Sequence, residues 1–523
     1  MTRVSSTAAD AAAGLPTLRV EGTLRDALAP DVLAQLTTED LTRFLGGRRW
    51  FGAKGGAPRS ARIASVVPIA WDDGSFAIAR VEVETEAGVR QRYQLPLAVR
   101  ERGAPTAVLA QIESAHGDGL LFDAVEDAAF RRHLADAFAR GARFEVRGSS
   151  WVVEPIGKRA LVVPLEAPIE LGTAEQSNTS IRFADEGIVK LFRKLEPGQN
   201  PDVEISSFLT TRANFPYTPA LFGVARFEDR DARSGKTETT LSAMLQEYLP
   251  GSVDAWSYVT KRGEEGGGRG ENARRSPTSD LPPPSFASDA RRLGEITRAL
   301  HEALASAGPE DPDFVPQPAT SSDVGEWAGA TEEQVGDALA LLERQLEAGR
   351  LPKEYVAEAR ALAKRREEAL HRVRELAQAV RGDAGLKIRH HGDYHLGQVL
   401  RTAVGDFMII DFEGEPARSL AERRRKHSAL RDVAGMLRSF AYAGATIAGG
   451  GSDVWEREAR EAFLTGYLES GDQPASFLPN NPDNVQRLIA LFETEKVFYE
   501  LAYELNNRPD WVWIPMRALE VRG

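Results

Sequence analysis

The spacing of apolar and polar residues divides the chain into a first part dominated by strands and a second part dominated by helices. Strand-like alternation runs through residues 61–70, 76–85 and 91–99, which are separated by short turns containing Gly. From about residue 288 onward, apolar residues recur every three or four positions, as on one face of a helix. The pattern predicts an α+β chain with helices over residues 122–141, 288–305, 323–349, 353–380, 428–442, 454–470 and 484–505.

Changes in this pattern also predict the domain organisation. We expect an N-terminal α+β cap domain over residues 1–102, a strand-rich segment over 103–249 and a helical lobe over 250–523. The strand that ends near Tyr248 runs into Leu-Pro-Gly, a sequence that suits a hinge between two lobes. Residues 262–285 contain Gly-Gly-Gly and Pro-Pro-Pro, and we expect them to form a flexible insertion.

Composition and charge narrow the class of protein. The 523 residues are 42% hydrophobic and 27% charged, which is ordinary for a soluble globular protein. A net charge of −12 argues against a protein that coats nucleic acid. The absence of cysteine excludes disulfides and thiolate metal sites. No signal-peptide core and no membrane-spanning apolar run are found, so we expect a cytoplasmic enzyme with no nucleic-acid or membrane partner.

The stretch from residue 388 to residue 416 carries the strongest chemical signal. Its pattern reads as strand, polar loop, hairpin and acidic turn, which places Asp393, Gln398 and Asp411 at neighbouring strand ends. One carboxylate can orient a hydroxyl, while an amide and a second carboxylate hold Mg²⁺ beneath a triphosphate. Phosphoryl transfer needs these parts because its catalysis is mostly positioning and charge neutralisation.

The histidines around Asp393 leave other interpretations open. His390, His391 and His395 suit loop histidines with satisfied hydrogen bonds, or the metal ligands of a phosphohydrolase. Gly392 disfavours the helix that would aim His391 and His395 at one ion. No Glu follows His391, so the zinc-protease helix motif is absent.

Weaker signals of the same chemistry lie earlier in the chain. Lys190 lies on a predicted strand and Glu204 in the first turn of the helix that follows, the arrangement of a kinase ion pair. The polar turn around Asn178 offers donors for phosphate oxygens. Taken alone, these features also fit a surface Lys, a Glu favoured by the helix dipole and an ordinary turn.

Taken together and in this order, the motifs resemble the aminoglycoside-phosphotransferase-like branch of the protein-kinase fold, and more closely the bacterial maltokinases. The resemblance is carried by residues 48–55, 175–180, 191–205, 391–400, 410–413 and 496–515. It implies a bilobal eukaryotic-kinase-like fold with an N-terminal cap and a mainly helical C-terminal lobe. It also implies ATP-dependent phosphorylation of maltose to α-maltose 1-phosphate, which feeds α-glucan and glycogen synthesis from trehalose, with trehalose synthase as a partner. A related sugar kinase, such as a glucosamine kinase, and a non-catalytic scaffold for trehalose synthase remain the alternatives.

The resemblance implies a role for each residue of these motifs. Asp393 resembles the catalytic base, and Gln398 and Asp411 resemble the Mg²⁺ ligands, although the wider branch usually has Asn at the position of Gln398. The residues that resemble an ATP site are the phosphate-loop donors Ser177, Asn178 and Thr179, the pair Lys190 and Glu204, and the adenine hinge Gln246, Glu247 and Tyr248.

The last long helix supplies the expected sugar site. Lys496, Tyr499 and Tyr503 recur at steps of three and four, so they share a helix face that suits sugar hydroxyls and a sugar ring. The alternative is a packed helix with ion pairs. The full set expected to bind the acceptor is His391, Lys496, Tyr499, Glu500, Tyr503, Glu504, Arg508 and Trp511.

Overall fold

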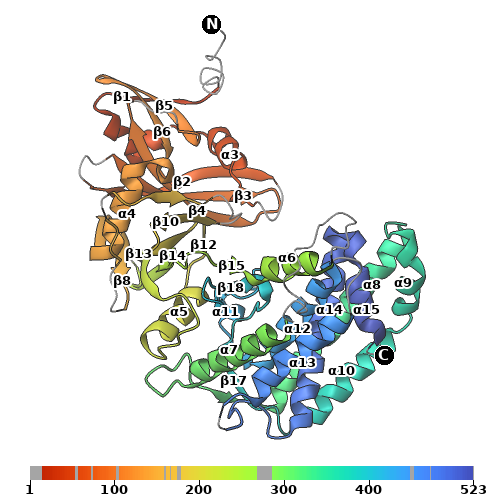
Figure 1. Ribbon diagram of the computed structural model, residues 1–523. Coiled ribbons are helices and arrows are strands. Elements are labelled where there is room, and N and C mark those ends of the chain that lie inside the picture. Colours follow the sequence, from red (N-terminus) through yellow and green to blue (C-terminus); the bar gives the residue numbers. More distant parts are fainter. Residues whose placement is uncertain are drawn as a thin grey trace, which may run out of the picture. The chain divides into compact units, whose positions relative to one another are not determined.

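The computed structural model describes residues 14–52, 57–71, 75–101, 105–157, 161–164, 166–172, 178–231, 233–267, 286–447, 453–471 and 473–521. They form two compact units (Figure 1). Unit 1 comprises Met1–Thr210 and Pro219–Pro250, and unit 2 comprises Thr211–Thr218 and Gly251–Gly523. The chain therefore passes from one unit to the other within the Leu-Pro-Gly sequence that suggested a hinge.

The first sheet of unit 1 contains seven strands. Six lie in the order β1-β5-β6-β4-β3-β2, and β12 pairs with β4. Three short helices contribute Leu28, Leu33 and Phe44 to the core beneath this sheet. The elements are β1 (Thr17–Val20), η1 (Leu24–Leu28), α2 (Pro30–Leu33), α3 (Thr38–Gly46), β2 (Pro58–Ile69), β3 (Phe76–Thr85), β4 (Arg90–Arg100), β5 (Val108–Ser114), β6 (Gly117–Asp123) and β12 (Lys194–Leu195).

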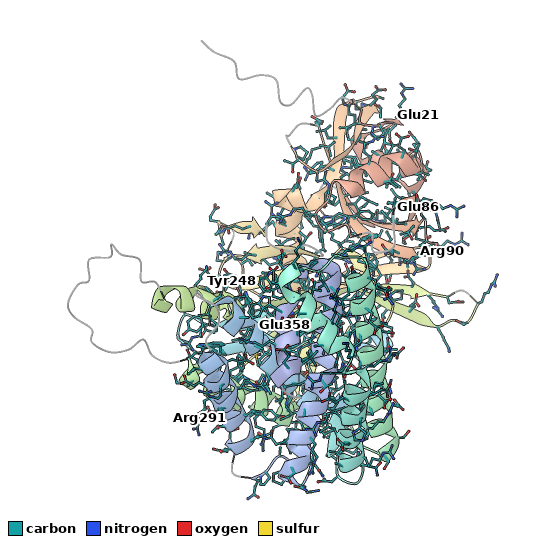
Figure 2. The ribbon with its side chains drawn as sticks, turned by 90° about the vertical axis from the view of Figure 1, so that its right-hand side faces the viewer. Glu21, Glu86, Arg90, Tyr248, Arg291 and Glu358 are labelled. Atoms are coloured by element: carbon teal, nitrogen blue, oxygen red, sulfur yellow. The ribbon has the colours of Figure 1, made fainter. Side chains whose placement is uncertain are left out.

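The β3–β4 hairpin shows how the alternating pattern forms this sheet. Phe76 lies opposite Ala98 and Glu84 lies opposite Arg90, so the register runs the full length of both strands. Glu86 lies in the turn between the strands and Arg90 begins β4; Figure 2 shows them close together. The apolar residues that alternate along β3 are buried, as the strand pattern predicts.

The second sheet of unit 1 has the order β7-β8-β13-β14-β11-β10-β9. Helix α4 packs on it through Phe130, Leu134 and Phe138, and α5 follows the short strand β12. The elements are η2 (Ala124–Glu126), α4 (Ala128–Arg140), β7 (Ala142–Val146), β8 (Ser149–Pro155), β9 (Ile169–Leu171), β10 (Asn178–Phe183), β11 (Gly187–Phe192), α5 (Pro201–Thr211), β13 (Leu221–Arg230) and β14 (Thr237–Glu247).

The two sheets of unit 1 share a core. One cluster of buried residues includes Ile69 and Phe76 from the first sheet and Trp151 and Phe227 from the second. The guanidinium of Arg193 also lies 2.8 Å from the carboxylate of Asp123, the last residue of β6, and both side chains are almost fully buried. The first sheet thus extends to residue 123, whereas we expected the cap domain to end at residue 102.

Unit 2 is mainly helical, and Figure 1 shows α14 among α8, α10 and α12. Its helices are α6 (Ala255–Gly267), α7 (Ala287–Ala305), α8 (Ser321–Glu347), η3 (Lys353–Tyr355), α9 (Val356–Ala363), α10 (Arg366–Val380), η4 (Leu396–Gln398), α11 (Leu420–Arg423), α12 (Leu430–Thr446), α13 (Asp453–Glu469), α14 (Pro482–Asn507), η5 (Pro509–Trp511) and α15 (Trp513–Val521).

Unit 2 also contains two small three-stranded sheets, β15-β18-β19 and β16-β17-β20. They hold the segment that the sequence singled out, because β17 precedes it and β18 and β19 lie within it. Their strands are β15 (Val253–Asp254), β16 (Gln317–Pro318), β17 (Leu386–Ile388), β18 (Val399–Arg401), β19 (Phe407–Ile409) and β20 (His427–Ser428).

The α+β fold with a mainly helical second half is as predicted, but three local expectations differ. The helix expected over residues 353–380 is broken into η3, α9 and α10 near Lys364, and Glu358 lies on α9 (Figure 2). The helix expected from residue 122 begins at Ala128, because β6 still continues through Asp123. Of the expected insertion at 262–285, α6 reaches Gly267, and residues 268–285 lie outside the described residues.

Candidate active site

Asp393 lies in the loop that connects β17 to η4. Its side chain is 23% exposed, and one carboxylate oxygen lies 3.6 Å from the Nζ atom of Lys496 on α14. The other oxygen lies 3.9 Å from Nε2 of His395. Burial lowers the pKa of His395, although the charge of Asp393 acts in the opposite direction. Asp393 is thus a partly exposed carboxylate with a fixed ammonium group beside it.

A buried carboxylate on helix α12 holds the loop that contains Asp393. Asp432 on α12 accepts hydrogen bonds from the backbone N–H groups of His391, at 2.7 Å, and Gly392, at 2.9 Å. The same carboxylate lies 3.1 Å from Nε2 of His301 on α7. Burial by itself would raise the pKa of Asp432, but the hydrogen bond from His301 and the surrounding histidines hold it well below its usual range.

Close packing fixes the loop further. A Cβ on Gly435 would lie 2.6 Å from the carbonyl oxygen of Tyr394, so only glycine lets α12 approach this closely. The Tyr394 hydroxyl bonds to the Thr297 hydroxyl on α7, at 2.8 Å. The N–H of Leu396 donates to the Ser439 hydroxyl, at 3.1 Å. Helices α7 and α12 therefore determine the position of Asp393.

Gln398 and Asp411 lie at the open end of the β18–β19 hairpin. The hairpin pairs Val399 with Ile409, and the N–H of Ile410 donates to the carbonyl of Gln398, at 3.0 Å. Asp411 has φ of 67°, a backbone conformation that is uncommon outside glycine and is found at functional sites. An amide oxygen and a carboxylate at adjacent strand ends form an oxygen donor set that fits Mg²⁺.

His391 connects the Asp393 loop to the hairpin. It is 1% exposed, and its Nε2 lies 2.9 Å from the carbonyl oxygen of Ile410. Its Nδ1 accepts a long hydrogen bond from the N–H of Asp393, at 3.4 Å. The structure therefore places His391 as a support between Asp393 and Asp411, which differs from the expected contact with the acceptor.

A cavity of about 220 Å³ lies against Asp393. Lys496 and Tyr499 of α14 line it, as expected for a sugar site, together with five charged residues that the sequence had not indicated. These residues are Glu415, Arg418, Arg431, Asp432 and Glu495. Glu495 directly precedes Lys496, and Glu415 belongs to the acidic turn after Asp411. Both therefore lie next to residues that the sequence predicted for the site.

The other residues expected on the sugar face of α14 lie elsewhere. The Glu500 carboxylate is buried against Arg438, at 2.7 Å, and Glu504 is bound by Arg508, at 2.6 Å. The Arg508 guanidinium also lies over the rings of Tyr503 and Trp511. The lining of the cavity includes none of these five residues, which are Glu500, Tyr503, Glu504, Arg508 and Trp511. For Glu500 and Glu504, the structure therefore agrees with the alternative given above, a packed helix with ion pairs.

The residues expected to bind nucleotide lie in unit 1. Lys190 lies on β11 opposite Ser180 of β10, and its Nζ lies 3.6 Å from the carboxylate of Asp202 at the start of α5. Asp202 precedes the expected partner Glu204 by two residues, and both carboxylates are buried. Asp202 was not among the residues expected at this site, and its position in the first helical turn also suits an acid that the helix dipole favours.

The phosphate-loop and hinge residues are only partly described. Asn178 begins β10, whereas Ser177 lies outside the described residues. The hydroxyl of Thr179 accepts a hydrogen bond from Arg193, at 2.8 Å, so it serves the core of unit 1. In β14, Gln246 has a buried amide nitrogen that makes no hydrogen bond within the described chain, and the carboxylate of Glu247 accepts from the N–H of Ala220. Beyond β14, the hydroxyl of Tyr248 accepts from Arg182.

Known structures identify the class of this fold. The structure of a glucosamine kinase in complex with glucosamine, ADP and inorganic phosphate superposes with a TM-score of 0.63 at 22% sequence identity, covering 94% of this chain and 98% of that chain. A glucosamine kinase structure in crystal form B gives the same TM-score at 21% sequence identity, covering 93% of this chain and 98% of that chain. The predicted kinase-like α+β fold is therefore confirmed.

Sequence comparisons refine this class. Residues 44–127 match the maltokinase N-terminal cap domain, so this part of the chain resembles the maltokinases, as predicted. Two curated relatives are glucosamine kinases. The protein from Streptacidiphilus jiangxiensis is 25% identical over 74% of this chain and 79% of its own length. The protein from Mycolicibacterium smegmatis is 27% identical over 68% of this chain and 78% of its own length. In the part of the chain that the structure describes, no helix is long and apolar enough to cross a bilayer.

The substitution Asp432→Asn tests the support of the loop. Asn keeps the shape but removes the charge that accepts two backbone bonds, and bonds to a charged acceptor contribute roughly 1.5–3 kcal/mol. We expect amide hydrogen exchange at His391 and Gly392 to become at least about tenfold faster. Helix α10 serves as the internal control, and unchanged exchange in the loop would contradict the assigned role.

The buried His390 predicts a dependence of stability on pH. Burial lowers its pKa from 6.5 to about 4. As the pH falls below about 6.5, this histidine becomes protonated in the unfolded chain but stays neutral in the folded chain. The free energy of unfolding therefore decreases between pH 6.5 and pH 4, with a slope of about 1.4 kcal/mol per pH unit. His390→Gln should flatten the acid limb of the unfolding free energy measured by urea titration. His371→Gln, at a side chain that is 71% exposed, should retain the wild-type slope.

Proposed function

We propose that this protein transfers the γ-phosphoryl group of ATP to maltose and forms α-maltose 1-phosphate, a precursor for α-glucan synthesis. The observation that carries the proposal is a carboxylate, Asp393, at the wall of a cavity of about 220 Å³ in which Arg418 and Arg431 are already paired with Glu415 and Glu495. The match of residues 44–127 to the maltokinase cap supports maltose as the acceptor.

The charges of the cavity favour an uncharged acceptor. Arg431 binds the carboxylate of Glu495 through two hydrogen bonds, at 2.8 and 2.7 Å. Arg418 donates to Glu415, at 2.8 Å, and also lies 3.3 Å from Glu495. Each of these carboxylates therefore has a cation already, and an ammonium group on the sugar would have to displace it. Hydroxyl groups can share such ion pairs without adding charge.

Lys496 and Tyr499 supply the remaining contacts. The Lys496 ammonium adds positive charge beside Asp393, which opposes a cationic acceptor further. Burial raises the pKa of Tyr499 to about 12, with smaller contributions from the charges of Glu415 and Asp393, so its hydroxyl keeps its proton. Its ring offers an apolar face and its hydroxyl a donor, which suits a sugar ring with hydroxyls at its edge.

The chemical step follows from the position of Asp393. Its carboxylate accepts the hydrogen bond of the sugar C1 hydroxyl, directs that oxygen towards the γ-phosphorus and takes up the proton as the new P–O bond forms and the bond to ADP breaks. Gln398 and Asp411 would hold Mg²⁺, which neutralises charge on the phosphates when bound. The Lys496 ammonium lies 3.6 Å from that carboxylate and restricts its orientation.

Glucosamine phosphorylation is the second candidate. It is favoured by the two glucosamine kinase relatives and by the fold match to a glucosamine kinase structure. Both candidates use the same Asp393 chemistry and differ in whether the cavity must compensate an ammonium group. A scaffold that docks trehalose synthase would need neither the compensated cavity nor the supported Asp393 loop.

The substitution Asp393→Asn tests the chemical role. It removes the proton acceptor but keeps the size of the side chain, so we expect kcat with ATP and maltose to fall by at least about a hundredfold. The melting temperature should stay close to that of the wild type. Asp337→Asn, at an exposed position of α8, is the matched control and should turn over normally. Near-normal turnover of Asp393→Asn would exclude this role.

The substitution Tyr499→Phe tests the sugar contact. Loss of one buried hydroxyl contact costs about 1 kcal/mol, so we expect the KM for maltose to rise roughly fivefold to tenfold while the KM for ATP stays unchanged. Tyr503→Phe lies one turn further along α14, outside the cavity lining, and should leave both constants unchanged. An equal rise in both variants would show that the acceptor extends along α14 instead.

A further inference from the structure

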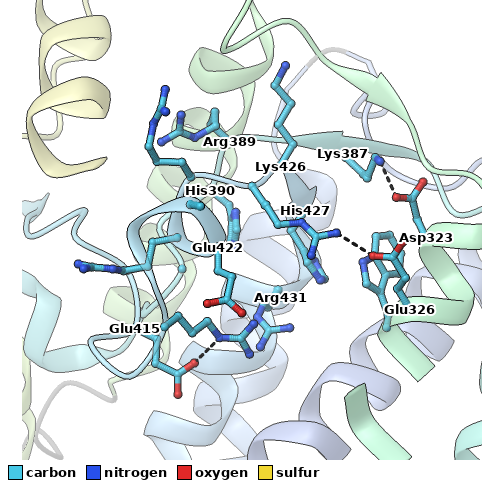
Figure 3. A pocket seen from close by; sticks show the side chains of 18 of the residues that line it. Asp323, Glu326, Lys387, Arg389, His390, Glu415, Glu422, Lys426, His427 and Arg431 are labelled. Atoms are coloured by element: carbon cyan, nitrogen blue, oxygen red, sulfur yellow. Dashed lines mark hydrogen bonds and ion pairs between the residues drawn. The ribbon is translucent and has the colours of Figure 1, made fainter. Parts of the chain in front are cut away.

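A second cavity, of about 600 Å³, adjoins the acceptor cavity within unit 2 (Figure 3). Its walls come mainly from the end of β17 with the residues after it, the N-terminal half of α8 and residues 414–427. Residues 312–317, Arg431 on α12 and Glu495 on α14 complete the lining. Glu415, Arg418, Arg431 and Glu495 line both cavities. The proposed sugar chemistry leaves this second cavity without a role.

The cavity is rich in positive charge. Eight Lys and Arg side chains line it, against six Asp and Glu side chains, in a chain whose net charge is −12. Four of the cations are consecutive in sequence, from Arg423 to Lys426, and all four line the cavity. The carboxylates are engaged already: Asp323 binds Lys387, at 2.5 Å, and Glu326 binds Arg425, at 2.7 Å (Figure 3).

Lys426 has a donor left for a ligand. Its ammonium donates to the backbone carbonyls of Val315, at 2.7 Å, and Pro312, at 3.1 Å. An ammonium group has three N–H donors, so one remains. Burial and the positive charges of Arg389 and Lys387 lower the pKa of Lys426, although Asp313 acts in the opposite direction. Lys426 is thus positioned by neutral carbonyls among other cations.

A buried histidine provides a second, independent observation. His390 lines the cavity and is only 8% exposed, yet its Nδ1 atom makes no hydrogen bond within the described chain. A buried polar nitrogen without a partner costs free energy, which a ligand in the cavity can recover. The ring of His427, which also lines the cavity, lies 5.6 Å from that of His390 and stacks on Trp327.

We propose that this second cavity binds a phosphate dianion, either as inorganic phosphate or as the phosphate group of a small sugar ester. A dianion would balance the excess of cations, accept the remaining N–H of Lys426 and contact His390 and Arg424. Charge-assisted bonds of this kind favour phosphate over neutral ligands. A volume of about 600 Å³ accommodates the whole of a sugar phosphate.

The site would couple phosphate binding to the proposed reaction. This consequence, unlike the binding itself, rests on the proposed function. A phosphate ester is the product of sugar phosphorylation, and the Arg418 and Arg431 ion pairs form a wall shared with the acceptor cavity. Occupation of the second cavity would attract these guanidinium groups away from Glu415 and Glu495, and so weaken acceptor binding.

The experiment is isothermal titration calorimetry of the full-length protein, without nucleotide or acceptor, with inorganic phosphate in one series and α-D-glucose 1-phosphate in another. The variants are Lys426→Met and Arg424→Gln, with Arg360→Gln on α9, an exposed cation outside the cavity, as the matched control. The melting temperature of each variant confirms that it is folded. Using two variants keeps the test valid if one of them does not fold.

We expect the wild type and Arg360→Gln to bind at least one of the two ligands, and each cavity variant to bind it about tenfold more weakly. Binding of both ligands would indicate recognition of the phosphate group alone, and binding of the ester only would indicate that the sugar contributes. No binding of either ligand at millimolar concentration would overturn the proposal, as would equal affinity in the wild type and in a folded cavity variant. Because no turnover is measured, the outcome is independent of whether maltose is the acceptor.

Discussion

The hydrogen bonds from the backbone of His391 and Gly392 to the buried carboxylate of Asp432 are the interaction on which the candidate site depends. They fasten a loop with little structure of its own to the middle of a helical bundle. One ring nitrogen of His301 also contacts the Asp432 carboxylate. The other ring nitrogen of His301 bonds to the hydroxyl of Tyr467 on α13. Three helices, α7, α12 and α13, therefore fix the position of Asp393. Positioning of this kind is what phosphoryl transfer requires of a protein.

Charged groups in the wall of the acceptor cavity are also paired with one another. Arg418 and Arg431 compensate Glu415 and Glu495, so the walls can bind hydroxyl groups without an uncompensated carboxylate. Buried ion pairs contribute little stability by themselves, because the charges lose their hydration. We propose that their value here is one of specificity, because paired walls disfavour an acceptor that carries charge. The Lys496 ammonium beside Asp393 acts in the same direction.

The sequence predicted the local parts of the site and missed the distant ones, for physical reasons. Gln398 and Asp411 lie at the ends of the β18–β19 hairpin, as their spacing predicts. Asp393 was also expected at a strand end, but it lies in the loop between β17 and η4. Asp432 lies 41 residues beyond His391, and one acid in an apolar helix gives no sign of which backbone groups it will bind. Tertiary contact, which spacing does not reveal, decides such a role.

The helix α14 shows the limit of periodicity. Steps of three and four correctly grouped Lys496 with Tyr499, which line the cavity. The same steps also included Glu500 and Glu504, which are buried and form ion pairs with Arg438 and Arg508. A buried helix with charged residues on several faces has no polar side that marks its ligand face. In unit 1, by contrast, alternation predicted β3 with its observed bounds, because hairpin register follows directly from a period of two.

We propose that the protein phosphorylates a neutral sugar bound in the Asp393 cavity. The most direct measurement is a competition assay in which the purified protein receives Mg-ATP with equal concentrations of maltose and glucosamine, and both products are quantified by ³¹P and ¹H NMR. The account predicts that phosphate appears mainly on C1 of maltose. Preferential phosphorylation of glucosamine would contradict the argument from compensated charges, while leaving the fold and the role of Asp393 intact.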